Sequence, residues 1–211
     1  ADRLGLQIVV HAIGDAAIEQ TLVAMEKALA RFPDPDRRHR IEHCGFNSDD
    51  QMRRMRKAGI EPVPQPVFIH DFGDLYVSVL GEKRSAESYP LRTWIERGFQ
   101  PAASSDAPVC DANPFPNFYT MLTRKTSRGT VIGGSEAVTM TQALQACTAL
   151  GAYVNKAEHH RGTLVPGMEA DIAVFSRDLF SASPEEVRDD TSCDLTLLGG
   201  QPVHARLGQW H

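Results

Sequence analysis

The sequence lacks several features that define specialised classes of protein. It has no apolar run of the roughly 20 residues that a membrane-spanning helix needs, and no charged segment leading into an apolar stretch opens it. Its 22 lysines and arginines are outnumbered by 27 aspartates and glutamates, and they form no basic stripe. We therefore expect neither a membrane nor a nucleic acid as a partner.

Cysteines are few and widely separated. The four of them, Cys44, Cys110, Cys147 and Cys193, form no C-x-x-C pair, which argues against a zinc ribbon or a redox motif. This pattern predicts a reduced, cytoplasmic protein. No methionine opens the chain, and the first ten residues suggest a helix end, a glycine and a strand. We therefore expect the chain to begin inside a fold.

What the sequence does contain is a regular alternation of short apolar runs and helix-period segments. The strands are expected at 7–10, 39–44, 60–69 and 100–108, and the helices at 16–31, 48–59, 89–98 and 139–157. Four strand–helix units in series predict a parallel sheet with helical crossovers. Residues 66–88 look irregular, and a stretch of that length is a candidate substrate loop.

The character of the sequence changes after residue 160. Strand-like segments punctuated by glycine and proline follow, with a short helical stretch only near "SPEEVRDD". We expect two parts, an α/β part over 1–160 and a small β part over 161–211.

Three of the expected strands end in a side chain that can bind a metal: His11, His43 and Asp106. Side chains alternate along a strand, so His43 should share the face of Ile41, and Arg40 and Glu42 should form a buried ion pair on the helix side. If the faces of the three residues line a barrel, they converge at its C-terminal mouth, where barrel enzymes keep their active sites.

Imidazole and carboxylate together are the ligands of a hard or borderline divalent ion, which lowers the pKa of water. Each residue alone also has a structural explanation, because a histidine at a strand end can be a core or cap residue. Asp106 after two serines can cap the next segment. The recurrence at three strand ends favours a metal site.

Six segments in order resemble one known family. They are "VVHAIGD", "RHRIEHC", "PVPQPVF", "LGEKR" with "YPLRTW", "SSDAPV" and "GTLVPGMEADIAVFSRD". Together, from about Gln7 to Arg206, they resemble the C-terminal half of the amidohydrolase superfamily in its amidohydrolase-3 (YtcJ-like) branch. The resemblance implies an α/β fold made of strands five to eight of a (β/α)₈ TIM-type barrel, followed by strands of a small β-sandwich.

The same resemblance implies roles for individual residues. His11 and His43 match metal ligands, and Asp106 matches an aspartate that contacts metal and serves as general acid/base. Gln65 matches a position that faces substrate, and His70, in the expected loop, is a further candidate substrate contact. The implied cofactor is a divalent metal, zinc in one or two copies. The family's His-x-His pair and its bridging ligand have no counterpart in this sequence.

We therefore expect a metal-dependent hydrolase that cleaves non-peptide C–N bonds of a small-molecule amide, formamide or cyclic amide with metal-activated water. The alternative is a non-catalytic fragment or remnant that assembles with another chain. In both cases we expect a homo-oligomer or association with a missing N-terminal portion, because half a barrel exposes a sheet edge. An open doubly wound binding domain is disfavoured, since no glycine-rich phosphate loop follows the first strand.

Overall fold

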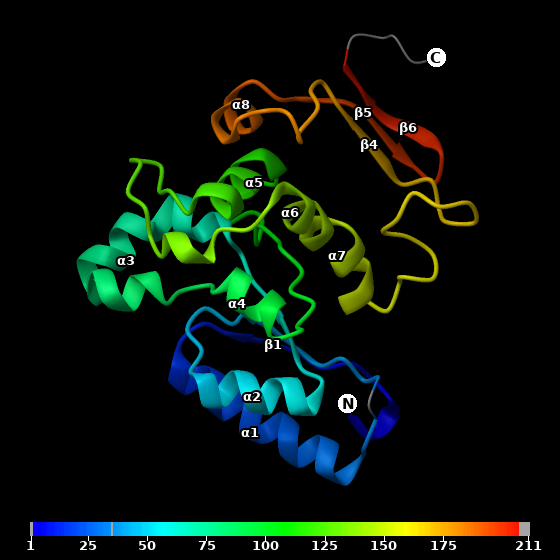
Figure 1. The fold of residues 1–211 in the computed structure, drawn as a ribbon. Helices are drawn as coiled ribbons and strands as arrows, with labels where there is room; N and C mark the ends of the chain where they lie inside the picture. Colours follow the sequence, from blue (N-terminus) through cyan, green and yellow to red (C-terminus); the bar gives the residue numbers. More distant parts are fainter. Residues whose placement is uncertain (1, 35, 207–211) are drawn as a thin grey trace.

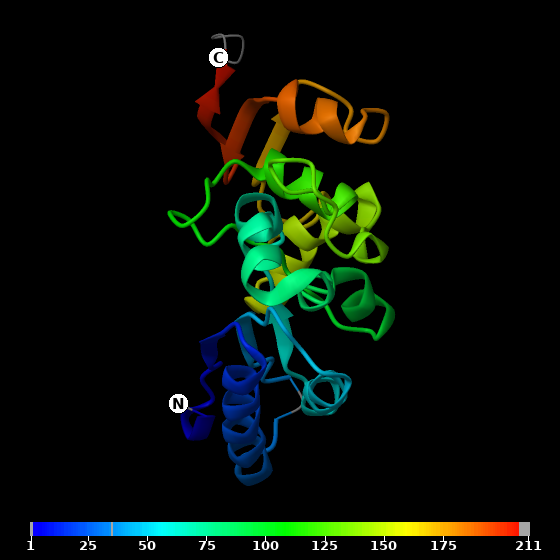
Figure 2. The same ribbon diagram turned by 90° about the vertical axis from the view of Figure 1, so that its left-hand side faces the viewer.

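A computed structural model describes residues 2–34 and 36–206 of the chain (Figure 1). Its elements are, in order, η1 Asp2–Leu4, β1 Val9–Ala12, α1 Asp15–Arg31, β2 Arg40–His43, α2 Asp49–Ala58, β3 Glu61–Val63, α3 Val67–Ala86, α4 Leu91–Glu96, α5 Pro114–Thr123, η2 Gly134–Glu136, α6 Met140–Cys147, α7 Ala149–Val154, β4 Ile172–Phe175, α8 Pro184–Asp189, β5 Cys193–Leu198 and β6 Gln201–Ala205. Figure 2 shows the β1–β3 sheet with α1 and α2 at one end of an elongated molecule and the β4–β6 sheet at the other.

The first sheet is parallel and has the order β1-β2-β3. Ile41 of β2 packs in one core cluster with Ile18 and Leu22 of α1, so α1 covers one face of the sheet. The predicted parallel sheet with helical crossovers is confirmed for these three strands. β1 lies at one edge, and no strand in the described ranges pairs with its outer side.

Local sequence features account for the two helices beside this sheet, α1 and α2. In α1, buried Ile18, Leu22 and Met25 recur at helical spacing and face the sheet. A capping box between Ser48 and Gln51 begins α2, which ends at a glycine in the left-handed conformation, as predicted. The predicted helices at 16–31 and 48–59 are therefore confirmed.

The expected strands at 60–69 and 100–108 are not formed at that length. β3 has only three residues, and 100–108 contains no assigned strand, although the Ser104 amide donates to the Pro64 carbonyl at 3.0 Å. Pro62, Pro64 and Pro66 have no N–H group to donate to a neighbouring strand. A regular ladder cannot extend along this segment, which corrects the prediction of a fourth strand.

The expected substrate loop at 66–88 is wrong, because this segment is helix α3. Gly73 is inside the helix, where a Cβ would come within 2.7 Å of Ile132 and Thr126. Glycine here permits close packing instead of a turn. At Gly81 the backbone is non-helical, with φ of 78°, and this residue kinks the helix.

Two further segments differ from the sequence-based expectation. Residues 114–123, for which the sequence predicted no helix, form α5, and Asn113 caps its start. The helix expected over 139–157 is divided into α6 and α7 at Thr148, which has φ of −127° and ψ of −89°. Thr139 is the cap that begins α6.

The described residues after residue 160 contain three strands and a short helix. Strands β4, β5 and β6 make an antiparallel sheet, and every residue of β6 is exposed. The short helix near "SPEEVRDD" is confirmed as α8. Across the described residues, no helix combines the length and apolar character needed to cross a membrane.

Candidate metal centre

The three predicted metal-binding residues lie at the carboxyl ends of neighbouring segments. His11 is near the end of β1, His43 ends β2, and Asp106 follows the extended segment that reaches Pro64. The imidazole centroids of His11 and His43 are 4.4 Å apart in an edge-on arrangement. Asp106 Oδ2 lies 4.0 Å from His43 Nε2. The structure therefore places His43 beside both His11 and Asp106.

The two histidines meet because the backbone of His43 departs from regular strand geometry. Ile8 and Val10 pack on the helix side of β1, so His11 faces the other side. Strict alternation would place His43 on the helix side with Ile41. His43 instead has a φ of +67°, a left-handed conformation that is uncommon outside glycine. This turn brings its ring back to the side of His11.

The predicted orientation of Arg40 and Glu42 is therefore wrong. They lie on the face opposite Ile41, away from α1, and Arg40 Nη1 donates to the side chain of Asn155, just after α7. The expected ion pair itself is present, with Arg40 Nε 2.8 Å from Glu42 Oε1. Burial raises the pKa of Glu42, and the nearby carboxylate of Asp106 adds to this effect.

His43 is the enclosed member of the site. It is 3% exposed, and its ring lies 5.6 Å from the ring of Phe68 at the start of α3. Burial, together with the neighbouring His11, lowers the pKa of His43, while Asp106 and Gln65 oppose that shift. This shift favours the neutral imidazole, which is the form that binds a metal.

Asp106 and His11 are the open members of the site. The Asp106 side chain is 41% exposed, and its backbone, like that of His43, is left-handed, with φ of +57°. Left-handed backbone at non-glycine residues costs free energy and is concentrated at functional sites. His11 is exposed on the edge strand.

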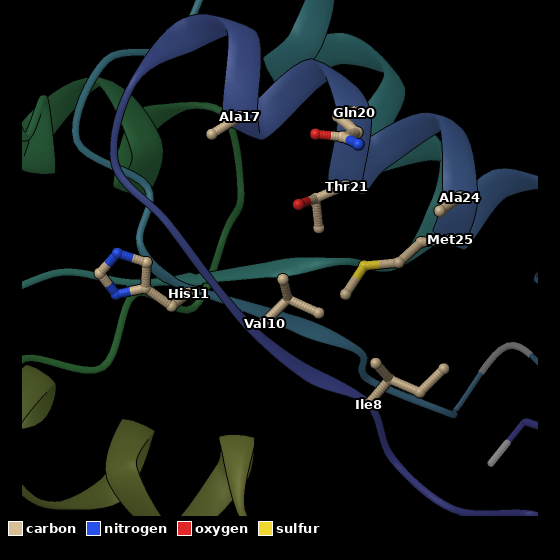
Figure 3. A pocket seen from close by; sticks show the side chains of 8 residues that line it. All are labelled: Ile8, Val10, His11, Ala17, Gln20, Thr21, Ala24 and Met25. Atoms are coloured by element: carbon tan, nitrogen blue, oxygen red, sulfur yellow. The ribbon is translucent and has the colours of Figure 1, made fainter.

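A hollow of about 420 Å³ runs along β1 and α1 beside His11 (Figure 3). Ile8 and Val10 of the strand face Met25 of the helix across it, and the His11 ring lies at its far end. Its lining is Ile8, Val10, His11, Ala17, Gln20, Thr21, Ala24 and Met25. This hollow follows the unpaired edge of the sheet.

The donor set fits a borderline divalent ion, since two imidazoles and one carboxylate are ligands that zinc commonly takes. Nε2 of His43 faces the Asp106 carboxylate with 4.0 Å between the atoms. Over residues 2–34 and 36–206, however, no three His, Cys, Asp or Glu side chains are gathered closely enough to hold an ion.

The two predicted substrate contacts lie in different surroundings. Gln65 is 2% exposed and donates from Nε2 to Ser104 Oγ at 2.8 Å, so it belongs to the site. His70 lies on α3, not in a loop; its Nδ1 is 2.7 Å from Asp71 Oδ1, and its ring is 6.1 Å from Tyr119 of α5. Their roles as substrate contacts stay predictions.

Cys44 directly follows His43 but is not a nucleophile. It is fully buried in the helix-side core, where it accepts a hydrogen bond from Asn47 at 3.0 Å. Burial raises the pKa of its thiol to about 12, so no thiolate forms near neutral pH.

Aromatic side chains that enclose His43 were not identified from the sequence. Phe68 packs against Phe72 and Tyr89 at centroid distances of 5.2 and 6.2 Å, and Tyr76 Oη lies 3.5 Å from Tyr89 Oη. The helical spacing of Phe68, Phe72 and Tyr76 is the signal in the sequence that could have identified this group.

The hydrogen bonds of Arg124, which hold the backbone next to this aromatic group, were not predicted from the sequence either. Buried Arg124 donates to the backbone carbonyls of Ser88, Tyr89 and Ile132 at 2.8 to 2.9 Å. The Tyr89 amide in turn donates to the Gly45 carbonyl at 2.8 Å, two residues after His43. Arg124 thus holds the corner of the chain that packs beside the site.

Fold and site together define an α/β protein whose polar side chains gather at the carboxyl ends of parallel strands, an arrangement typical of enzymes. A family model described as the amidohydrolase family matches residues 1–204. The chain belongs to the amidohydrolase family, which confirms the resemblance seen in its motifs.

Individual relatives agree with this assignment. The chain is 33% identical over 210 residues to Protein LONG AFTER FAR-RED 3 of Arabidopsis thaliana, and the match covers 97% of the chain and 35% of the relative. It is 28% identical over 190 residues to the N-substituted formamide deformylase of Arthrobacter pascens, covering 90% of the chain and 35% of the relative. The chain thus spans about a third of the length of these two curated relatives.

A solved structure, an uncharacterized metal-dependent hydrolase from Pyrococcus horikoshii OT3, is also similar. It matches with a TM-score of 0.74 at 28% identity, over 88% of this chain and 37% of the neighbour.

Proposed function

We propose that His11, His43 and Asp106 form part of the active site of a metal-dependent hydrolase acting on non-peptide C–N bonds of amides, formamides or cyclic amides. The observation that carries this proposal is that His43 lies beside both His11 and Asp106, which come from separate segment ends. The left-handed backbone of His43 and Asp106 supports it, because such conformations are concentrated at functional sites. The formamide deformylase among the relatives supports the substrate class.

In this proposal His11 and His43 hold a divalent ion, zinc by the chemistry of the donor set. The bound ion would supply a Lewis acid that polarises a carbonyl and lowers the pKa of water. Asp106 would accept a proton from the attacking water on its carboxylate and donate it to the departing nitrogen, a role that its exposed side chain permits. Burial keeps the His43 imidazole unprotonated and ready to bind.

We further propose that 1–160 corresponds to strands five to eight of a TIM-type barrel and 161–211 to part of a small β-sandwich. The free edge of β1 and the hollow beside α1 would then receive a strand and helix from an N-terminal portion or from another copy of the chain. Exposed Leu4, Leu6 and Val9 near this edge support such an association. Four free cysteines support a reducing, cytoplasmic location.

A non-catalytic assembly piece is the second candidate. The unpaired edge of β1 favours it, because that edge offers backbone groups to another chain whether or not a metal binds.

The test uses the complete protein with Asp106→Asn and, as a matched control, Asp50→Asn on the exposed surface of α2. Hydrolysis of N-substituted formamides and cyclic amides is measured together with zinc content. We expect Asp106→Asn to lower kcat by about 100-fold or more while the circular dichroism spectrum is unchanged, and Asp50→Asn to have no effect. Full activity of Asp106→Asn would overturn the proposed role. A wild-type protein without metal or hydrolysis would favour the assembly candidate.

A further inference from the structure

The side-chain amide of Gln65 is buried at the site, and both N–H groups of its nitrogen donate hydrogen bonds. The residue is 2% exposed, and Nε2 donates to Ser104 Oγ at 2.8 Å and to the Val63 carbonyl at 3.1 Å. A backbone carbonyl can only accept a hydrogen bond, so the nitrogen of the amide must face Val63. The oxygen Oε1 therefore points to the opposite side, and the amide cannot be flipped without leaving Val63 facing another acceptor.

Oε1 of Gln65 is buried and has no hydrogen-bond partner among the described residues. A buried acceptor without a donor costs about 1–3 kcal/mol, so a donor close to it is expected. The imidazole of His43 is the donor that fits, because a side-chain hydrogen bond with Gln65 is among the influences that oppose the lowering of the His43 pKa.

The His43 ring also has a buried nitrogen without a hydrogen-bond partner among the described residues. Its Nε2 is directed to the Asp106 carboxylate, 4.0 Å away, while its Nδ1 is buried and has no hydrogen-bond partner in the part of the chain that is described. A proton on Nδ1 would satisfy this nitrogen and the Gln65 oxygen with one hydrogen bond.

We propose that Gln65 is a positioning residue whose amide oxygen accepts the Nδ1–H of His43 and thereby holds the tautomer with its Nε2 lone pair facing Asp106. Histidines that bind metals commonly donate their other N–H to an acceptor in this way. What the lone pair binds rests on the proposed function, whereas the tautomer is a property of this chain alone. Gln65, which is 2% exposed, thus acts through His43.

A buried chain of hydrogen bonds supports the amide and connects it to the segment that carries Asp106. Ser104, which accepts from Gln65, precedes Asp106 by two residues. Asn117 of α5 donates to the Ser104 carbonyl at 3.2 Å and accepts from the Val67 amide at 3.0 Å. The same network therefore orients His43 and fixes the approach of the Asp106 segment.

The test reads the tautomer directly in the complete, metal-free protein with ¹⁵N-labelled histidine. Of the eight histidines, His43 is assigned by the signals lost in His43→Gln. Neutral Nδ1–H and Nε2–H forms give different ¹⁵N shifts and different two-bond couplings to the ring protons. Gln65→Leu removes the acceptor, and Gln51→Leu is the matched control, a buried glutamine on α2 that bonds to the Asp15 carbonyl.

We expect His43 to be the Nδ1–H tautomer in the wild type and to shift toward Nε2–H in Gln65→Leu. Zinc affinity should fall about 10- to 100-fold in Gln65→Leu, and Gln51→Leu should change neither property. An Nε2–H tautomer in the wild type overturns the proposal, and this measurement holds even if Gln65→Leu does not fold. An unchanged tautomer in folded Gln65→Leu overturns it too. A Gln65-dependent tautomer in a protein that binds no zinc supports the positioning role and contradicts the proposed function.

Discussion

The ends of β1 and β2 carry the same kind of side chain in opposite surroundings. His43 is 3% exposed, since β2 has a strand on each side and the start of α3 lies over its ring. His11 is exposed, because β1 is an edge strand. The imidazoles nevertheless lie 4.4 Å apart.

This comparison teaches that the chain itself organises one side of the site and leaves the other open. On the β2 side, His43 is buried, the ring of Phe68 lies against it, and Tyr89 packs on Phe68. On the β1 side the neighbouring feature is the hollow between the strand and α1. A site organised on one side only is expected to bind metal weakly until the open edge is covered.

The largest effect should come from loosening the organised side at Arg124. Arg124→Met leaves the Ser88, Tyr89 and Ile132 carbonyls without their donor, so we expect a loss of about 3 kcal/mol or more in the free energy of unfolding. Urea denaturation of the two proteins measures it. As a control, Arg54→Met removes half-exposed ion pairs between α1 and α2 and should cost less. Equal losses would show that Arg124 has no special part in holding this side.

A smaller effect should separate the two histidines. His43→Ala empties a buried position and should cost about 1–3 kcal/mol, whereas His11→Ala should cost under about 0.5 kcal/mol because His11 is exposed. Thermal and urea denaturation in the absence of metal measure both.

The backbone of His43 offers an internal check on this prediction. His43→Gly should be more stable than His43→Ala by about 1 kcal/mol, since glycine adopts a φ of +67° without strain. Equal stability of the alanine and glycine variants would contradict a left-handed His43, and equal costs at His11 and His43 would remove the difference between the two sides.

The smallest effect concerns pH and Glu61, which lies beside Arg40 in the register of β2 and β3. Burial raises the pKa of Glu61 above its ordinary value of 4.5. The native state then holds a proton that the unfolded state releases, so the contribution of Glu61 to stability is greatest below pH 4.5 and is lost as pH rises through the raised pKa.

Glu61→Gln keeps an oxygen that can accept the hydrogen bond from the Gln100 amide. The difference in unfolding free energy between variant and wild type therefore isolates the effect of pH on the Glu61 carboxyl. We expect the variant to gain stability relative to the wild type between pH 4 and pH 7, measured as the difference of their unfolding free energies at each pH. A difference that is constant with pH, or that changes in the opposite direction, would contradict the raised pKa.

Local pattern was sufficient for much of the first sheet and its helices. The Ser48 capping box, the glycine that ends α2 and the apolar spacing of Ile18, Leu22 and Met25 are local signals, and the helices form where they predict. Local pattern failed at α3, because the role of Gly73 depends on Ile132 and Thr126, which lie far along the chain.

The sequence by itself determined the kind of side chain at each segment end, and the order of its motifs identified the family. Only the tertiary structure decided that His43 would meet His11, since strand alternation alone would point their rings to opposite faces of the sheet. Close to the left-handed turn at His43, the Tyr89 amide, remote in sequence, donates to the Gly45 carbonyl. Such a conformation is costly for an isolated residue and persists only where surrounding packing compensates for it, so no pattern of neighbouring residues could reveal it.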